Sequence, residues 1–279
     1  MDRIPFLKMH GLGNDFVVLD ARLRRVEIGG AAARALADRH TGIGCDQVIV
    51  LEPPSDPDAS AKMRIRNADG STAEACGNAA RCIAWLLLRE TGGTRLRLET
   101  EGGVLGAEAL ADGRIAIDMG SPRTRWHEIP LASEMDTLYV ALCRGPLATP
   151  VCSNIGNPHA TFFVDDAEQV DLAVLGPVLE SDPLFPKRAN IGVASLSGRD
   201  RIRLRVWERG AGITRACGSG ACAALVAAHR RGLCEPSATV ELDGGSLEIA
   251  WRGDGHVIMR GPAALSFEGS FDPALLRAA

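Results

Sequence analysis

Two cysteines stand in matched surroundings that suit acid–base chemistry. Cys76 precedes a glycine and an alanine-rich segment, and Cys217 precedes a Gly-Ser-Gly segment. Both segments predict the start of a helix, where the first backbone N–H groups lack partners and the helix dipole adds partial positive charge. Such a point stabilises a thiolate, and the glycines let N–H groups converge on an anion. Each cysteine therefore predicts a reactive, low-pKa thiol beside a small anion-binding nest.

The two cysteines occupy equivalent points of an internal repeat. Residues 65–80 match residues 206–221, each position lying 141 after its counterpart, as Cys217 does after Cys76. Two further pairs recur at an offset of 143, namely Gly13-Asn14 with Gly156-Asn157 and Gln47-Val48 with Asn190-Ile191. The common order predicts two similar lobes. Chance likeness between Gly- and Ala-rich segments is the alternative.

Apolar periodicity predicts the elements that position these cysteines. Main helices are expected at 77–90 and 218–231, each directly after its cysteine, with a shorter helix at 30–40. The expected strands are 15–20, 46–51, 62–67, 95–100, 104–110, 114–118, 151–155, 160–164, 201–206, 238–242, 246–251 and 256–260. This pattern is typical of an α+β chain in which each lobe carries one main helix.

Composition limits the class of protein. The 279 residues are enough for two domains, and the net charge of −4 with no basic stripe argues against nucleic acid as a partner. The N-terminus lacks the apolar run of a signal peptide, and no apolar stretch is long enough to span a membrane, so we expect a cytoplasmic protein. The eight cysteines include no C-x-x-C pair, which argues against a structural zinc site. A cytoplasmic chain of this length and apolar content needs no disulfide framework.

The paired thiols predict an inversion of a carbon centre without a cofactor. If the lobes face each other, a carboxylate held at the helix starts places its α-carbon between the sulfurs. One thiolate then removes the α-proton while the other thiol protonates the opposite face. Pyridoxal phosphate, the alternative route, needs a Schiff-base lysine. Of the three lysines, Lys8, Lys62 and Lys187, none lies in a recognisable phosphate-binding context.

Seven segments together resemble the diaminopimelate epimerase family, from residue 6 to about residue 262. They are His10–Phe16 (HGLGNDF), Asn67–Gly70 (NADG), Ala75–Asn78 (ACGN), Gly156–His159 (GNPH), Arg188–Ile191 (RANI), Trp207–Gly210 (WERG) and Ala216–Cys222 (ACGSGAC).

The resemblance implies two pseudo-symmetric lobes, each a β-barrel-like sheet around a central helix. We expect an N-terminal lobe of residues 1–119 plus 265–279 and a C-terminal lobe of 120–264. It also implies the interconversion of LL- and meso-2,6-diaminopimelate, in lysine and peptidoglycan precursor synthesis. Cys76 would be the base on the LL isomer and Cys217 the base on the meso isomer, with a homodimer as the assembly.

The resemblance further implies a set of substrate-binding positions. These are Asn14, Gln47, Asn67, Gly77, Asn78, Asn157, Asn190, Glu208, Arg209, Gly218 and Ser219, with His159 in support. Their chemistry suits a substrate with two carboxylates and two ammonium groups. Arg209 can grip a carboxylate through its planar guanidinium, and Glu208 can accept from an ammonium group.

Two positions depart from the family's pattern, and two other functions stay open. Ala79 stands where the family commonly has glycine, and Phe267 where it often has a tyrosine at a dimer contact. One alternative is a related two-cysteine racemase of proline or hydroxyproline. The other is a bilobal small-molecule binding protein, although binding alone requires no pair of thiols.

Overall fold

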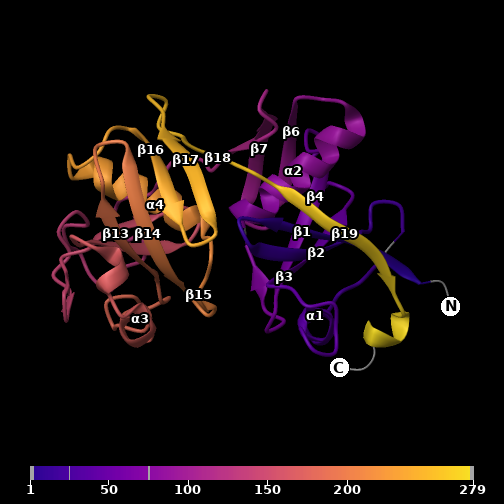
Figure 1. The fold of residues 1–279 in the computed structure, drawn as a ribbon, viewed down its shortest axis with the longest axis horizontal. Coiled ribbons are helices and arrows are strands. Elements are labelled where there is room, and N and C mark those ends of the chain that lie inside the picture. The colour runs from indigo at the N-terminus through magenta and orange to yellow at the C-terminus, as the bar shows by residue number, and fades with distance from the viewer. Residues whose placement is uncertain (1–2, 25, 75, 277–279) are drawn as a thin grey trace. The chain divides into compact units, whose positions relative to one another are not determined.

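The chain folds into two compact units. A computed structural model describes residues 3–24, 26–74 and 76–276. One unit comprises Met1–Ile117 with Gly261–Ala279, and the other comprises Asp118–Arg260 (Figure 1).

The first unit is a sheet with two helices. Its strands are β1 (Ile4–Gly11), β2 (Asn14–Asp20), β3 (Gln47–Glu52), β4 (Ala61–Asn67), β5 (Thr72–Ala73), β6 (Arg95–Thr100), β7 (Gly103–Ala109), β8 (Ile115–Asp118) and β19 (Ala264–Phe271). Its helices are α1 (Gly30–Ala37), α2 (Gly77–Thr91) and the short 3₁₀ helix η2 (Pro273–Leu276). β19 pairs antiparallel with β1, which brings the C-terminal segment into the N-terminal unit.

The second unit carries a corresponding set. Its strands are β9 (Cys143–Arg144), β10 (Leu147–Ala148), β11 (Val151–Asn154), β12 (Pro158–Phe163), β13 (Asn190–Leu196), β14 (Arg201–Glu208), β15 (Gly212–Ile213), β16 (Ser237–Leu242), β17 (Gly245–Trp251) and β18 (Val257–Gly261). Its helices are η1 (Ala167–Gln169), α3 (Leu172–Glu180) and α4 (Gly218–Arg230).

The two units share one order of strand pairing. In the first, β1–β2 is antiparallel, β2–β3 parallel, β3–β4 and β4–β5 antiparallel, β4–β6 parallel and β6–β7 antiparallel. The second unit has the same sequence of antiparallel and parallel pairs, in the order β11–β12, β12–β13, β13–β14, β14–β15, β14–β16 and β16–β17. The predicted α+β fold with two pseudo-symmetric lobes is thereby confirmed.

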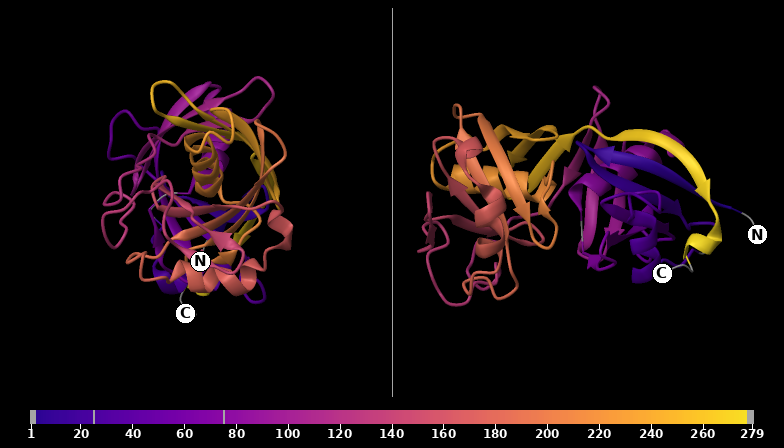
Figure 2. Two further views of the ribbon diagram at one scale, coloured as in Figure 1. Left: turned by 90° about the vertical axis from the view of Figure 1, so that its left-hand side faces the viewer. Right: turned by 60° about the horizontal axis from the view of Figure 1, so that its bottom comes forward.

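One buried helix lies at the centre of each unit. α4 contacts six strands of its own unit, from β11 to β17, and nearly all of its residues are buried (Figures 1 and 2). α2 contacts β1, β6 and β7, and ends at Gly92, whose φ of 68° is a left-handed cap that glycine adopts without strain. Both helices are rich in alanine, which favours helix and allows strands to approach closely.

Several elements differ from the sequence-based expectation. β1, β13, β19 and α3 were not predicted, because the patterns that specify them are not local. α3 contains Gly176 and Pro177, which argue against a helix. The structure explains the glycine, because a Cβ there would lie 2.4 Å from the Trp207 ring. Among the described residues, no helix is long and apolar enough to cross a membrane.

The central position of α4 predicts a strong effect of truncation. Leu225 on α4 is fully buried, whereas Leu233 just beyond the helix is 38% exposed. Leu225→Ala should lower the free energy of unfolding of its unit by about 2–5 kcal/mol, because a cavity is left behind. Leu233→Ala is the matched control and should cost less than about 1 kcal/mol. Urea unfolding measures both, and equal losses would contradict a central α4.

Candidate active site

A two-residue turn places Asn14 beside Cys76 in the first unit. Leu12 and Gly13 have φ of 58° and 85°, which makes a type I′ turn between β1 and β2. Asn14 is therefore the first residue of β2. Cys76 is the N-cap of α2 with an extended backbone, φ −145° and ψ 112°.

A chain of amide contacts surrounds the Cys76 thiol. Its Sγ lies 3.8 Å from Asn14 Oδ1, a distance suited to a hydrogen bond from sulfur. Asn78 Nδ2 donates to the same Oδ1 at 3.2 Å, and Asn14 Nδ2 donates to Asp46 Oδ2 at 2.8 Å. The structure thus brings Asn14, Cys76 and Asn78 together, as predicted, and adds Asp46.

Gln47 and Asn67 are direct partners across β3 and β4. Gln47 Nε2 donates to Asn67 Oδ1 at 2.9 Å, and Asn67 Nδ2 donates to Ser71 Oγ at 3.0 Å. Gln47 Oε1 is buried and has no hydrogen-bond partner within the described part of the chain. A buried acceptor without a donor is costly, so this oxygen suits a ligand N–H group.

The second unit holds Cys217 in a more enclosed setting. Cys217 is the N-cap of α4, is only 4% exposed, and its Sγ accepts from Gly220 N–H at 3.3 Å. The Sγ also lies 3.6 Å from Ser219 Oγ. His159 Nε2 lies 3.1 Å from Ser219 Oγ and 2.7 Å from Asn157 Oδ1. A continuous polar chain therefore leads from Asn157 to the sulfur.

Glycine at position 220 permits this sulfur contact. A Cβ built there would lie 3.2 Å from Cys217 Sγ and 3.2 Å from Val206 Cγ2, closer than most real Cβ contacts. The equivalent position of the repeat is Ala79, whose side chain is fully buried at the start of α2. The first turn of α2 therefore carries the Ala79 methyl group at the position where the first turn of α4 has the hydrogen of Gly220.

Burial sets the protonation state of the second half-site. Desolvation raises the pKa of the Cys217 thiol well above its usual value, and the Glu208 carboxylate raises it further, against hydrogen bonds from Ser219 and Gly220. The expected low pKa is therefore wrong for Cys217, because loss of water outweighs the helix N–H groups. Burial, with the nearby charge of Arg209, lowers the pKa of His159 to about 3. Cys217 rests as a thiol and His159 as a neutral imidazole.

The Glu208-Arg209 segment lies at the end of β14, in the same unit. Asn190 Oδ1 accepts from Arg209 N–H at 2.9 Å, and Asn190 Nδ2 donates to Pro158 O at 2.9 Å. Glu208 accepts from Thr214 Oγ1 and acts electrostatically on Cys217. The exposed Arg209 side chain donates to Lys187 O at 3.0 Å.

Each unit thus assembles its own half of the predicted site. Asn14, Gln47, Asn67, Cys76, Gly77 and Asn78 belong to the first, and Asn157, His159, Asn190, Glu208, Arg209, Cys217, Gly218 and Ser219 to the second. Sequence reasoning missed four polar residues that hold these side chains, namely Asp46, Ser71, Glu180 and Thr214. For Asp46 the sequence did carry one signal, because this residue directly precedes the predicted site residue Gln47. Glu180 accepts from Trp207 Nε1 at 2.6 Å and from Gly210 N–H at 3.0 Å.

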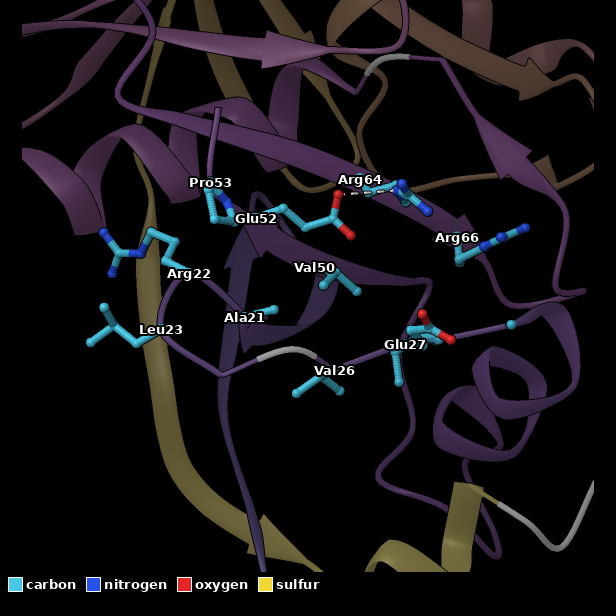
Figure 3. Close-up of a pocket in the computed structure, with 12 residues that line it drawn as sticks. Ala21, Arg22, Leu23, Val26, Glu27, Val50, Glu52, Pro53, Arg64 and Arg66 are labelled. Carbon is cyan, nitrogen blue, oxygen red and sulfur yellow. Dashed lines mark ion pairs between the residues drawn. The ribbon is translucent and has the colours of Figure 1, made fainter. Parts of the chain in front are cut away.

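A pocket of about 600 Å³ in the first unit lies apart from these residues. It is lined by Arg64, Arg66 and Glu52, together with apolar side chains of the segment after β2 (Figure 3). Successive side chains of a strand point to opposite faces of the sheet. Along β4, the side chains of Arg64 and Arg66 therefore lie on one face and that of Asn67 on the other. The pocket therefore contains none of the predicted site residues.

The cysteines, which all lie in the described part of the chain, form no disulfide bonds. All eight cysteines are present as thiols. Over the described ranges, no group of three or more His, Cys, Asp or Glu side chains is arranged to hold a metal ion.

The buried imidazole predicts a pH dependence of stability. The pKa of His159 is about 3 in the folded chain against 6.5 for an ordinary histidine, so below about pH 6.5 only the unfolded chain binds this proton. The stability from neutral His159 is full above that pH and falls by about 1.4 kcal/mol per pH unit as the pH drops toward 3. Urea unfolding between pH 7 and 5 should show a steeper loss for the native chain than for His159→Gln. Equal slopes would argue against a neutral ring.

Known proteins of one family are similar to this chain in sequence. The sequence profile described as diaminopimelate epimerase matches residues 6–125 and 151–266. A diaminopimelate epimerase of Acidiphilium cryptum is 57% identical over 272 residues, covering 98% of both chains. One of Rhodospirillum centenum is 59% identical over 271 residues, covering 97% of this chain and 93% of its own.

Solved structures of other names share the fold. A probable proline racemase from Agrobacterium radiobacter K84 gives a TM-score of 0.71 at 18% identity, covering 98% of this chain and 95% of its own. A hydroxyproline epimerase from Agrobacterium vitis, with bound trans-4-hydroxy-L-proline, gives 0.70 at 16% identity, covering 98% and 94%. Because the profile and the close relatives span nearly the whole sequence, the chain belongs to the diaminopimelate epimerase family.

Proposed function

We propose that this protein is a cofactor-independent epimerase that interconverts LL- and meso-2,6-diaminopimelate, for lysine and peptidoglycan precursor synthesis. Cys76 and Cys217 are the two acid–base groups. The observation that carries the proposal is the recurrence of one arrangement in both units, a cysteine at the N-cap of the central helix beside polar residues. Family membership supplies the substrate.

The reaction requires both sulfurs to reach one α-carbon from opposite faces. A thiolate takes the α-proton, so that the Cα–H bond breaks and an S–H bond forms. The other thiol gives its proton to the opposite face and becomes the thiolate. Backbone N–H groups at the helix starts, at Gly77 and Gly218, are donors for the substrate carboxylate, on which negative charge develops.

The resting state of Cys217 fits one direction of this reaction. A protonated Cys217 is the acid that conversion of LL to meso substrate requires, with Cys76 as the base. The Glu208 charge and burial both favour the thiol form at Cys217. Ser219 and Gly220 then provide the hydrogen bonds that a thiolate needs after proton transfer.

The polar side chains favour a long substrate with two charged ends. Arg209 offers an exposed guanidinium to a carboxylate, and Glu208 a carboxylate to an ammonium group. The buried Gln47 Oε1 provides a further acceptor in the other unit. Proline and hydroxyproline have a single charged end and would leave the Arg209 charge without a carboxylate. A binding protein without catalysis would have no use for two thiols.

Two further statements belong to the proposal. We place the reaction in the cytoplasm, because the mechanism needs two reduced thiols and that compartment keeps them reduced. A homodimer stays a prediction, which analytical ultracentrifugation of the purified chain would test.

Removal of either thiol tests the mechanism. Cys76→Ala and Cys217→Ala should each lower the rate of epimerisation by about 10²- to 10⁴-fold or more, because each removes one acid–base group. Cys143→Ala alters an exposed cysteine outside the site and serves as the control. In D₂O, turnover of LL-diaminopimelate by the native enzyme should place deuterium at the inverted α-carbon, detected by mass spectrometry. Full activity in either variant would exclude a two-thiol mechanism.

Direct competition between substrates tests the specificity. The native enzyme should epimerise LL-diaminopimelate with a kcat/KM at least about 10³-fold above that for L-proline, because buried or charged partners left unpaired penalise the shorter substrate. Arg209→Gln should reduce this ratio. A preference for proline or hydroxyproline would overturn the substrate assignment while leaving the two-thiol chemistry intact.

A further inference from the structure

A carboxylate outside the predicted site holds Asn14 in place. Asp46 directly precedes β3, and its Oδ2 accepts from Asn14 Nδ2 at 2.8 Å and from the Asp15 backbone N–H at 3.1 Å. A carboxylate can only accept hydrogen bonds. The amide of Asn14 must therefore turn its NH₂ group toward Asp46, which leaves Oδ1 on the side of Cys76.

The contacts of Asn14 Oδ1 are consistent with the same orientation of the amide. Asn78 Nδ2 donates to Asn14 Oδ1 at 3.2 Å, and Cys76 Sγ lies 3.8 Å from the same oxygen. If the amide were turned over, its NH₂ group would face the donor of Asn78 and its oxygen would face a carboxylate. Both contacts would then be unfavourable, so the orientation has one stable solution.

Asp46 is itself fixed by a cluster of charges. Arg39 Nη2 donates to Asp46 Oδ1 at 2.8 Å and to Asp15 Oδ1 at 2.7 Å. Lys8 Nζ, on a largely buried side chain, pairs with Asp15 Oδ2 at 2.6 Å and also donates to Gly44 O. Burial opposes ionisation of Asp15, but Arg39 and Lys8 outweigh it and lower its pKa to about 2. Asp15 therefore stays ionised between Arg39 and Lys8 at neutral pH.

The second unit has no counterpart of this arrangement among its described residues. The position equivalent to Asp46 is Ala189, which is buried. There, Asn157 is held by the neutral ring of His159 and not by a carboxylate. The two thiols therefore face differently oriented polar groups, with a fixed carbonyl oxygen at Cys76 and N–H and O–H groups at Cys217.

We propose that Asp46 is a positioning residue that fixes the amide of Asn14 so that its carbonyl oxygen faces Cys76. This inference deepens the proposed function and rests on it for the role of Cys76. A carbonyl oxygen beside sulfur stabilises the thiol over the thiolate, whereas an amide N–H would stabilise the thiolate. The oxygen is also the group that can accept from a substrate ammonium. Asp46 thus fixes which group of the Asn14 amide the Cys76 sulfur meets.

Alkylation of the two thiols in the intact protein tests this role without any substrate. Iodoacetamide is added at pH 7.5, and peptide mass spectrometry gives separate rates for Cys76 and Cys217. In Asp46→Asn, the Asn14 amide can turn its NH₂ group toward sulfur, and Cys76 should react about threefold faster. That figure corresponds to a pKa about one unit lower, half offset by reduced nucleophilicity. The rate at Cys217 should not change.

Two controls separate positioning from general damage to the fold. Asp20→Asn removes a similarly exposed carboxylate at the other end of β2, paired with Arg22 at 2.6 Å, and should change neither rate. In an Asn14→Ala background, Asp46→Asn should add no further change at Cys76, because its effect acts through Asn14. If Asp46→Asn does not fold, Arg39→Gln loosens the same carboxylate from an exposed side chain and should accelerate Cys76 alone.

Each result of the alkylation experiment either supports or overturns the positioning role of Asp46. An unchanged rate at Cys76 in the folded Asp46→Asn variant, an equal change at both thiols, or a persisting effect in the Asn14→Ala background would overturn the positioning role. The epimerase assay is independent of this result. A native enzyme inactive on diaminopimelate, yet showing the selective change at Cys76, would overturn the proposed function and leave the positioning of Asn14 intact.

Discussion

Each unit of this protein is organised around one central helix whose first N–H groups have no acceptor within the helix. A helix enclosed by strands leaves its first N–H groups directed out of the end of the unit. In both units the residue at this point is a cysteine in extended conformation, followed by a glycine. The position of this cysteine is thus a consequence of how the core is built.

Two similar units do not produce two equal thiols. At Cys217, four-percent exposure and the charge of Glu208 favour the thiol, while Gly220 and Ser219 stand ready to bind a thiolate. At Cys76, the adjacent polar group is a carbonyl oxygen held by Asp46. The two units therefore differ in the residue that holds the asparagine of the repeat, Asp46 for Asn14 and His159 for Asn157. The Cys217 sulfur accordingly has donors beside it, whereas the Cys76 sulfur has an acceptor.

The supporting residues also show why the charged cluster lies where it does. Asp15 and Asp46 adjoin Asn14 and Gln47 in the sequence, at the starts of two parallel strands. Parallel pairing brings those starts together, so two acidic residues meet and require Arg39 and Lys8 to offset their repulsion. The buried Lys8 on β1 pairs with Asp15 and also donates to Gly44 O. Charge compensation at this point therefore links β1, β2 and β3 to the geometry around Cys76.

The sequence by itself determined the duplication, the two central helices, the cysteines at their starts and the family to which the chain belongs. These features are local, since a cysteine, the glycine after it and an apolar helical period lie within one stretch of chain. The tertiary structure alone decided the remainder. β19 pairs with a strand some 260 positions earlier (Phe271 with Ile4), and Gly176 is required by the Trp207 ring. The pKa of Cys217 rises and the Asn14 amide is oriented because burial and hydrogen-bond partners come from distant segments, which no local pattern encodes.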